Sequence, residues 1–79
     1  MGRYIKDARY HIEKIKHYYK HGGDRGYYKA SHNYSELSDL ALRAERSKNN
    51  KNDVAIILAL RESVSDMMDE MQKRAEDSN

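Results

Sequence analysis

Glu13, His17 and His21 recur at intervals of four residues, and Asp24 follows shortly after them. Two imidazoles at positions i and i+4 of a helix lie on one face and can chelate a divalent metal. In metalloprotease helices the catalytic glutamate lies between the two histidines, whereas Glu13 precedes both, and lysines flank the group. We therefore interpret His17 and His21 as solvated surface side chains, and we predict no metal site and no cofactor.

The sequence contains none of the common catalytic patterns. It has no cysteine to act as a nucleophile, no glycine-rich phosphate loop and no serine in a strand-to-helix turn. Asp66, Asp69 and Glu70 face away from the expected core, and Glu70 can pair with Arg74 along one helix. These carboxylates are expected to form a solvated acidic surface, so the sequence predicts that the protein is not an enzyme.

Basic residues are concentrated in the first part of the chain. Residues 1–29 contain eight Lys or Arg against three Asp or Glu, whereas residues 53–79 contain three against seven. Basic side chains beside exposed tyrosine rings can follow a phosphate backbone while the rings stack on bases. Nucleic-acid binding is therefore an alternative function, and its candidate residues are Arg9, Lys16, Lys20, Arg25 and Lys29.

All seven aromatic residues are tyrosines, and all occur at or before Tyr34. At about 100° per residue, Tyr4, His11 and Tyr18 lie along one edge of the first apolar stripe. The rings could simply pack at the rim of the bundle with their hydroxyls in water. The alternative is that this edge binds a protein partner, and we take Tyr4, His11 and Tyr18 as the candidate partner-binding residues.

Three segments carry apolar residues at steps of three and four, which is a coiled-coil-like heptad pattern. Each stripe covers one side of a helix and needs a partner to cover it. We predict helices over residues 3–21, 25–47 and 53–75, with residues 76–79 as a frayed tail. The stripes are Ile5, Ala8, Ile12, Ile15 and Tyr19; Tyr27, Ala30, Tyr34, Leu37, Ala41 and Ala44; and Ile57, Leu60, Val64, Met67 and Met71.

Short polar segments separate the predicted helices. Gly22 and Gly23 can end the first helix, and Asp24 is a candidate N-cap for the second. A turn this short favours an antiparallel hairpin. The polar segment 47–52 is typical of a loop, and Asn52 or Asp53 could cap the third helix. The chain is therefore predicted to be one domain, an all-α, up-down-up antiparallel bundle of three helices.

The third predicted helix has more apolar residues than one stripe requires. Val54 and Leu58 project away from the stripe, whereas Ile56 is expected to fill space beside the small alanines of the second helix. Single exposed aliphatic residues are common on soluble proteins. A core of this size, however, usually gives limited stability, and oligomerisation is a frequent remedy. We predict self-association, as a homodimer or other homo-oligomer, through Val54 and Leu58.

Membrane insertion is not expected, because the longest apolar run, Val54 to Leu60, is far shorter than the roughly 20 residues that span a bilayer. Lys6 occupies the position where a myristoylation signal has Ser or Thr. The lack of cysteine suits a reducing compartment. These features predict a cytoplasmic protein.

The helical layout resembles that of MIT and TPR-like peptide-binding modules, but the TPR consensus residues and a 34-residue repeat are absent. No binding residue is carried over from them. The chain has the size of many phage or plasmid regulators that bind one host or self protein. We predict a small regulatory interaction protein whose partner is another protein.

Overall fold

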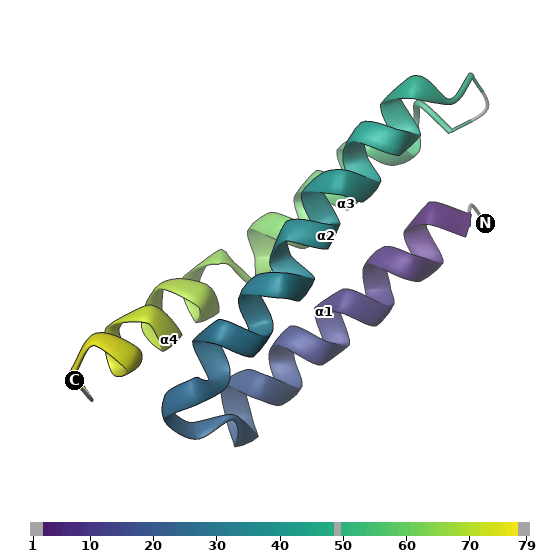
Figure 1. The fold of residues 1–79 in the computed structure, drawn as a ribbon. Coiled ribbons are helices and arrows are strands. Elements are labelled where there is room, and N and C mark those ends of the chain that lie inside the picture. Colours follow the sequence, from purple (N-terminus) through teal and green to yellow (C-terminus); the bar gives the residue numbers. More distant parts are fainter. Residues whose placement is uncertain (1–2, 49, 78–79) are drawn as a thin grey trace.

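The computed structural model describes residues 3–48 and 50–77 and confirms the all-α, up-down-up bundle (Figure 1). The second helix runs antiparallel to the first, and the chain then returns alongside both. The bundle is elongated, with principal extents of 45 × 16 × 16 Å. Its elements are α1 (Arg3–His21), the 3-10 helix η1 (Gly23–Arg25), α2 (Gly26–Arg46), α3 (Asp53–Ser63) and α4 (Ser65–Asp77).

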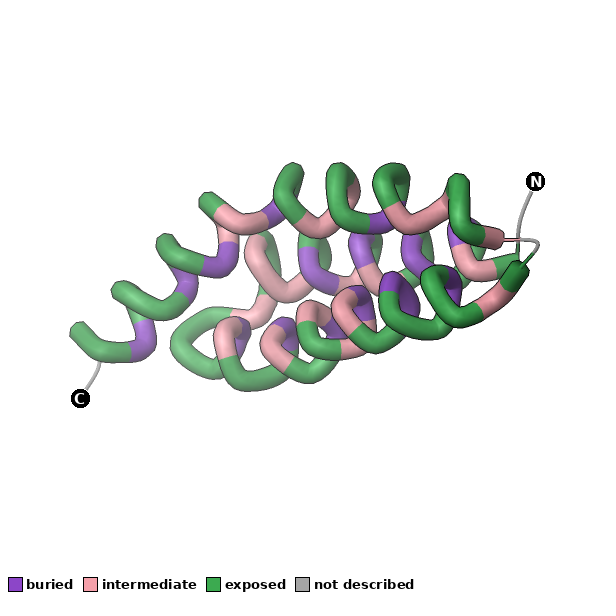
Figure 2. Tube along the Cα trace, turned by 90° about the horizontal axis from the view of Figure 1, so that it is seen from above, coloured by how far each residue is buried: buried purple, intermediate pink, exposed green. Residues whose placement is uncertain are grey.

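The predicted apolar stripes form the core, which runs along the inside of the bundle (Figure 2). Tyr19, Tyr27 and Tyr34 lie at its margin, half-buried and packed against it. The periodicity did not identify Asn33 and Leu40 as core residues, although both are buried in α2. The largest fully buried side chains are Ile15, Leu37, Ile57 and Val64.

The apolar stripe of α4 runs through Met68, not through the predicted Met67. Met68 and Met71 are buried, whereas Met67 is only half-buried at the margin. The series of Met68 and Met71 continues, at steps of three and four residues, to Ala75, which is 5% exposed. The alternative series of Met67 and Met71 would continue to Arg74. Burying Arg74 would be unfavourable, because it would remove a charge from water. The choice of stripe therefore follows from the residue one turn later.

Two glycines allow α1 and α2 to approach closely at their turn. A Cβ atom built on Gly26 would lie 2.7 Å from the Tyr18 carbonyl oxygen, and one on Gly22 would lie 2.5 Å from the same atom. Gly23, between them, has φ of +58°, the left-handed conformation that glycine adopts readily. The predicted end of the first helix at these glycines is confirmed. Asp24, predicted as an N-cap, lies instead within η1, and no side chain caps α2.

Residues 47–48 and 50–52 form a loop after α2, as predicted, whereas residue 49 lies outside the described residues. Within it, the Asn50 side-chain amide donates to the Ser47 hydroxyl at 2.8 Å, and the Asn50 backbone donates to the Ser47 carbonyl. The Asp53 backbone N–H then donates to the Asn50 carbonyl at 3.0 Å. Asn52 precedes α3 but makes no side-chain capping bond. Backbone turns, not a side-chain cap, therefore lead into α3.

The third predicted helix is interrupted at Val64, so that α3 and α4 are separate segments (Figure 1). The Val64 N–H donates to Arg61, three residues back, and not to Leu60 as in a regular α-helix. The Ser63 hydroxyl donates to the Leu60 carbonyl at 2.5 Å, and the Ser65 hydroxyl donates to the Glu62 carbonyl at 2.9 Å. Serine hydroxyls that bond nearby carbonyls in this way favour a bend. The two serines around a β-branched residue account for the interruption.

The helix continues further than predicted at the C-terminal end. Residues 76 and 77 belong to α4, whereas residues 78 and 79 of the predicted frayed tail lie outside the described residues. Within residues 3–48 and 50–77, no helix has the length and apolar character required to cross a membrane.

Candidate interaction surface

The outer side of α3 is apolar. Seven consecutive residues, Val54 to Leu60, are aliphatic or alanine, yet Ile57 is the one fully buried residue of this helix. Ala55 and Ala59 are exposed, and the larger side chains of Ile56 and Leu58 are 45% and 48% exposed. Figure 2 shows the outer turns of this helix as exposed. We call these four residues, Ala55, Ile56, Leu58 and Ala59, the α3 face.

The structure reverses the predicted burial of Val54 and Ile56. Val54, predicted to project outward, is half-buried and packs against the core, and Ile56, predicted to fill the core, is exposed. Leu58 is exposed as predicted. Val54 and Ile56 lie on opposite flanks of Ile57, about 60° and 100° from it around the helix. The flank that carries Val54 also carries Arg61, which contacts Tyr34 of α2, so α2 covers Val54 and leaves Ile56 open.

Charges occur only at the two ends of α3. Asp53 begins the helix, and Arg61 and Glu62 lie in its last turn. The Arg61 guanidinium lies over the Tyr34 ring, 4.3 Å from its centre, and is therefore held toward α2. On the helix beside it, Leu42 adds another aliphatic side chain that is 51% exposed. A helix that is apolar on all sides is normally covered on all sides, which makes the α3 face the strongest candidate interaction surface.

The predicted partner-binding edge of α1 lies partly within the bundle. Tyr4, His11 and Tyr18 are all half-buried, and the two tyrosines pack against the core. The His11 Nδ1 atom accepts a hydrogen bond from the Asn33 amide of α2 at 2.9 Å. This edge therefore lies at the junction of α1 and α2, where its side chains already contact other parts of the chain.

The five predicted nucleic-acid-binding residues are all exposed, but they lie on three elements. Lys16 and Lys20 line a shallow depression on α1 together with Glu13, His17 and His21, with a volume of about 200 Å³. Arg9 precedes them on the same flank, about 160° around the helix from the His11 position that contacts α2. Arg25 belongs to η1 and Lys29 to α2. The structure thus brings three of the five residues onto one flank.

His17 and His21, the predicted surface histidines, both line this depression. The rings of His17 and His21 are close, with centroids 5.2 Å apart. The nearby carboxylate, Glu13, lies 3.9 Å from the Lys16 ammonium. Among the described residues, no group of three or more His, Cys, Asp or Glu side chains is placed to hold a metal ion.

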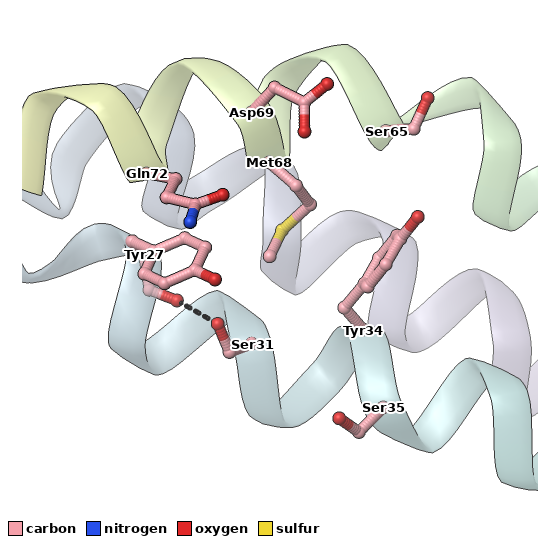
Figure 3. Close-up of a pocket in the computed structure, with 8 residues that line it drawn as sticks. All are labelled: Tyr27, Ser31, Tyr34, Ser35, Ser65, Met68, Asp69 and Gln72. Carbon is pink, nitrogen blue, oxygen red and sulfur yellow. Dashed lines mark hydrogen bonds between the residues drawn. The ribbon is translucent and has the colours of Figure 1, made fainter.

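A groove between α2 and α4 was not predicted from the sequence. It has a volume of about 300 Å³, with Met68 between the rings of Tyr27 and Tyr34 and with Asp69 at the rim (Figure 3). The Ser31 hydroxyl beneath it donates to the Tyr27 carbonyl at 2.7 Å. Each helix supplies only part of the lining, so the periodicity of one helix could not reveal it. The remaining lining residues are Ser35, Ser65 and Gln72.

A polar cluster joins the end of α1 to α4. The Tyr19 hydroxyl donates to the Glu70 carboxylate at 2.5 Å, and Arg74 lies over the Tyr19 ring, 4.9 Å from its centre. The Tyr19–Glu70 hydrogen bond is the main reason that the pKa of Tyr19 is raised and the pKa of Glu70 is lowered. Arg74 also forms the predicted ion pair with Glu70, at 2.9 Å. The cluster therefore stabilises the position of α4.

No known family model, curated protein or solved structure matches the chain.

Proposed function

We propose that the protein is a small, non-enzymatic helical interaction protein that binds other protein chains, as a homo-oligomer, through the α3 face. The observation that carries this proposal is the exposure of Ile56 and Leu58, at 45% and 48%, on a helix with no charged residue between Asp53 and Arg61. Covering these side chains removes apolar surface from water, which is the main favourable term in most protein association.

The small size of the bundle supports the same conclusion. A single core in a chain of 79 residues supplies limited stability, and association commonly adds to it. Binding to the folded state stabilises that state by mass action. A regulatory role in the cytoplasm fits an interaction protein without cysteine, and we include both in the proposal.

Sedimentation or light scattering over a range of protein concentrations tests the proposal. We expect the wild-type chain to form oligomers as its concentration rises, and Leu58→Glu to remain monomeric because each oligomer would bury a carboxylate. Tyr28→Glu is the matched control, because Tyr28 is an exposed apolar residue on α2, 61% exposed, outside the α3 face. A wild-type chain that stays monomeric at millimolar concentration would contradict self-association.

Nucleic-acid binding is the second candidate function, because Arg9, Lys16 and Lys20 are exposed along one flank of α1. Binding of this kind releases counterions, so its affinity should fall steeply between low and physiological salt. Lys16→Ala with Lys20→Ala should weaken binding to single- and double-stranded probes at low salt. Lack of retention of the wild-type chain on either probe at low salt would remove this candidate.

A further inference from the structure

The arrangement of side chains on the α3 face indicates which partner it fits. Ala55 and Ala59 lie one turn apart, each about 160° around the helix from the buried Ile57, and so they form the most outward part of the face. Ile56 and Leu58 stand on either side of them. Small residues in the middle allow another helix to approach closely, while the larger residues pack along its sides.

We infer that the occupant of this face is the same face of a second copy, with the two α3 helices packed antiparallel. Ala55 then lies opposite Ala59 of the partner subunit, and the two-fold axis passes near the level of Ile57. In a closed two-fold dimer the same surface is used by both copies, and each contact occurs twice. This inference rests on the proposed function, because it specifies how the self-association takes place.

Charges at the ends of the face select the antiparallel orientation. Lys51 is exposed just before α3 begins, and Glu62 is exposed in its last turn. In the antiparallel pair, position 62 of one copy lies near positions 51 and 52 of the other, so each Glu62 meets a lysine. A parallel pair would place Glu62 beside Glu62 of the partner subunit, and Lys51 beside the partner's Lys51. Antiparallel helix dipoles also avoid the like-charged ends that a parallel pair brings together.

Arg61 does not offset the carboxylate at this end of the face. Its guanidinium is directed toward α2, with the Tyr34 ring 4.3 Å away, and its Nε atom is buried. The exposed charge at the end of the α3 face is therefore that of Glu62. By contrast, the exposed flank of α1 that carries Arg9, Lys16 and Lys20 is strongly charged and offers no apolar surface of this kind.

Disulfide trapping tests the orientation directly, because the natural chain has no cysteine. Ala55→Cys and Ala59→Cys are prepared separately, one of them labelled with nitrogen-15. The two are mixed and equilibrated in a glutathione buffer, and the disulfide dimers are identified by mass. We expect the mixed disulfide to exceed each same-variant disulfide by about tenfold, because same-variant cysteines would be offset by about 6 Å along the helices, beyond easy disulfide reach.

The other outcomes of trapping are also decisive. A majority of same-variant disulfides would overturn the antiparallel orientation but leave the proposed function intact, since the α3 faces would still meet. If the wild-type chain oligomerises but the mixed cysteine variants form no disulfide, another surface is used, which overturns this inference. A monomeric wild-type chain would overturn both this inference and the self-association on which it rests.

Charge reversal provides an independent test of the same register. Lys51→Glu and Glu62→Lys should each weaken dimerisation about three- to tenfold, since two symmetry-related pairs become repulsive, and the double variant should recover the wild-type affinity. Glu45→Lys, at an exposed position on α2, is the control for the change in net charge. A double variant weaker than both single variants would overturn the pairing of Lys51 with Glu62.

Discussion

The Tyr19 hydroxyl and the Glu70 carboxylate are joined by a hydrogen bond of 2.5 Å across 51 positions of sequence. This bond connects the last turn of α1 to the middle of α4, beyond the interruption at Val64. Arg74 contacts both residues, through the Tyr19 ring and the Glu70 carboxylate. The cluster therefore joins α1 to the part of the third helix that the interruption separates from α3.

The Tyr19–Glu70 bond predicts how stability depends on pH. The pKa of Glu70 lies below its ordinary value of 4.5, so its contribution to stability is present above that value and is lost as the pH falls through the lowered pKa. The pKa of Tyr19 lies above 10.0, so its contribution is present below that value and is lost as the pH rises through the raised pKa. The bond should therefore stabilise the fold most between these limits.

Tyr19→Phe removes the bond while keeping the ring. Thermal unfolding of both chains across the pH range should show a lower midpoint for the variant near neutral pH. The difference between the two chains should shrink as the pH falls below the lowered pKa of Glu70 and as it rises above the raised pKa of Tyr19, because the wild-type bond is lost at both extremes. A difference that stays constant across that range would show that the effect of Tyr19→Phe does not come from this hydrogen bond.

Gly26→Ala is expected to destabilise the protein, although alanine is the better helix former by about 1 kcal/mol. The added Cβ would lie 2.7 Å from the Tyr18 carbonyl oxygen and 3.4 Å from the Met71 sulfur, so α1 and α2 would have to separate. We expect a loss of about 1–3 kcal/mol in the free energy of unfolding, measured in urea. Asp39→Ala, at an exposed position of α2, should change it by less than about 0.5 kcal/mol. A more stable Gly26→Ala variant would refute the close contact.

Asn33 and His11 should be energetically coupled. Asn33 is only 8% exposed, and its amide donates to the His11 Nδ1 atom at 2.9 Å. A double-mutant cycle with Asn33→Ala and His11→Ala should give a coupling energy of about 0.5–1.5 kcal/mol. The control cycle combines Asn33→Ala with Tyr10→Ala, because Tyr10 is next to His11 in the sequence but is 58% exposed. Additive effects of Asn33→Ala and His11→Ala would mean that the hydrogen bond contributes no net stability.

The general fold could be predicted because local patterns determine it. Ile12, Leu37 and Ile57 recur in stripes that only helix packing can cover, and Gly22 and Gly23 mark the first turn. The interruption at Val64 was missed, because two serine hydroxyls that bond nearby carbonyls leave no trace in apolar periodicity.

Features that depend on contacts between distant segments could not be predicted in this way. Gly26 is necessary because α1 approaches it, and the sequence of α2 alone shows only a glycine near a helix start. Val54 and Ile56 flank the same buried residue, and the position of α2 decides which of them is covered. An excess of apolar residues on the third helix was visible in the sequence, but the side on which it lies depends on the packing.

Ile57 and Leu58 provide the sharpest comparison of core and surface, because they are adjacent, similar in volume and 0% and 48% exposed. Ile57→Ala should lower the free energy of unfolding by about 2–5 kcal/mol through the cavity that it leaves. Leu58→Ala should change it by less than about 0.5 kcal/mol at concentrations where the chain is monomeric. At higher concentrations, where self-association adds to stability by mass action, the wild-type unfolding midpoint should rise while that of Leu58→Ala stays nearly constant. Urea unfolding at low and high protein concentration therefore separates the core contribution of one residue from the interaction role proposed for its neighbour. Equal dependence on concentration in both chains would exclude Leu58 from the interface.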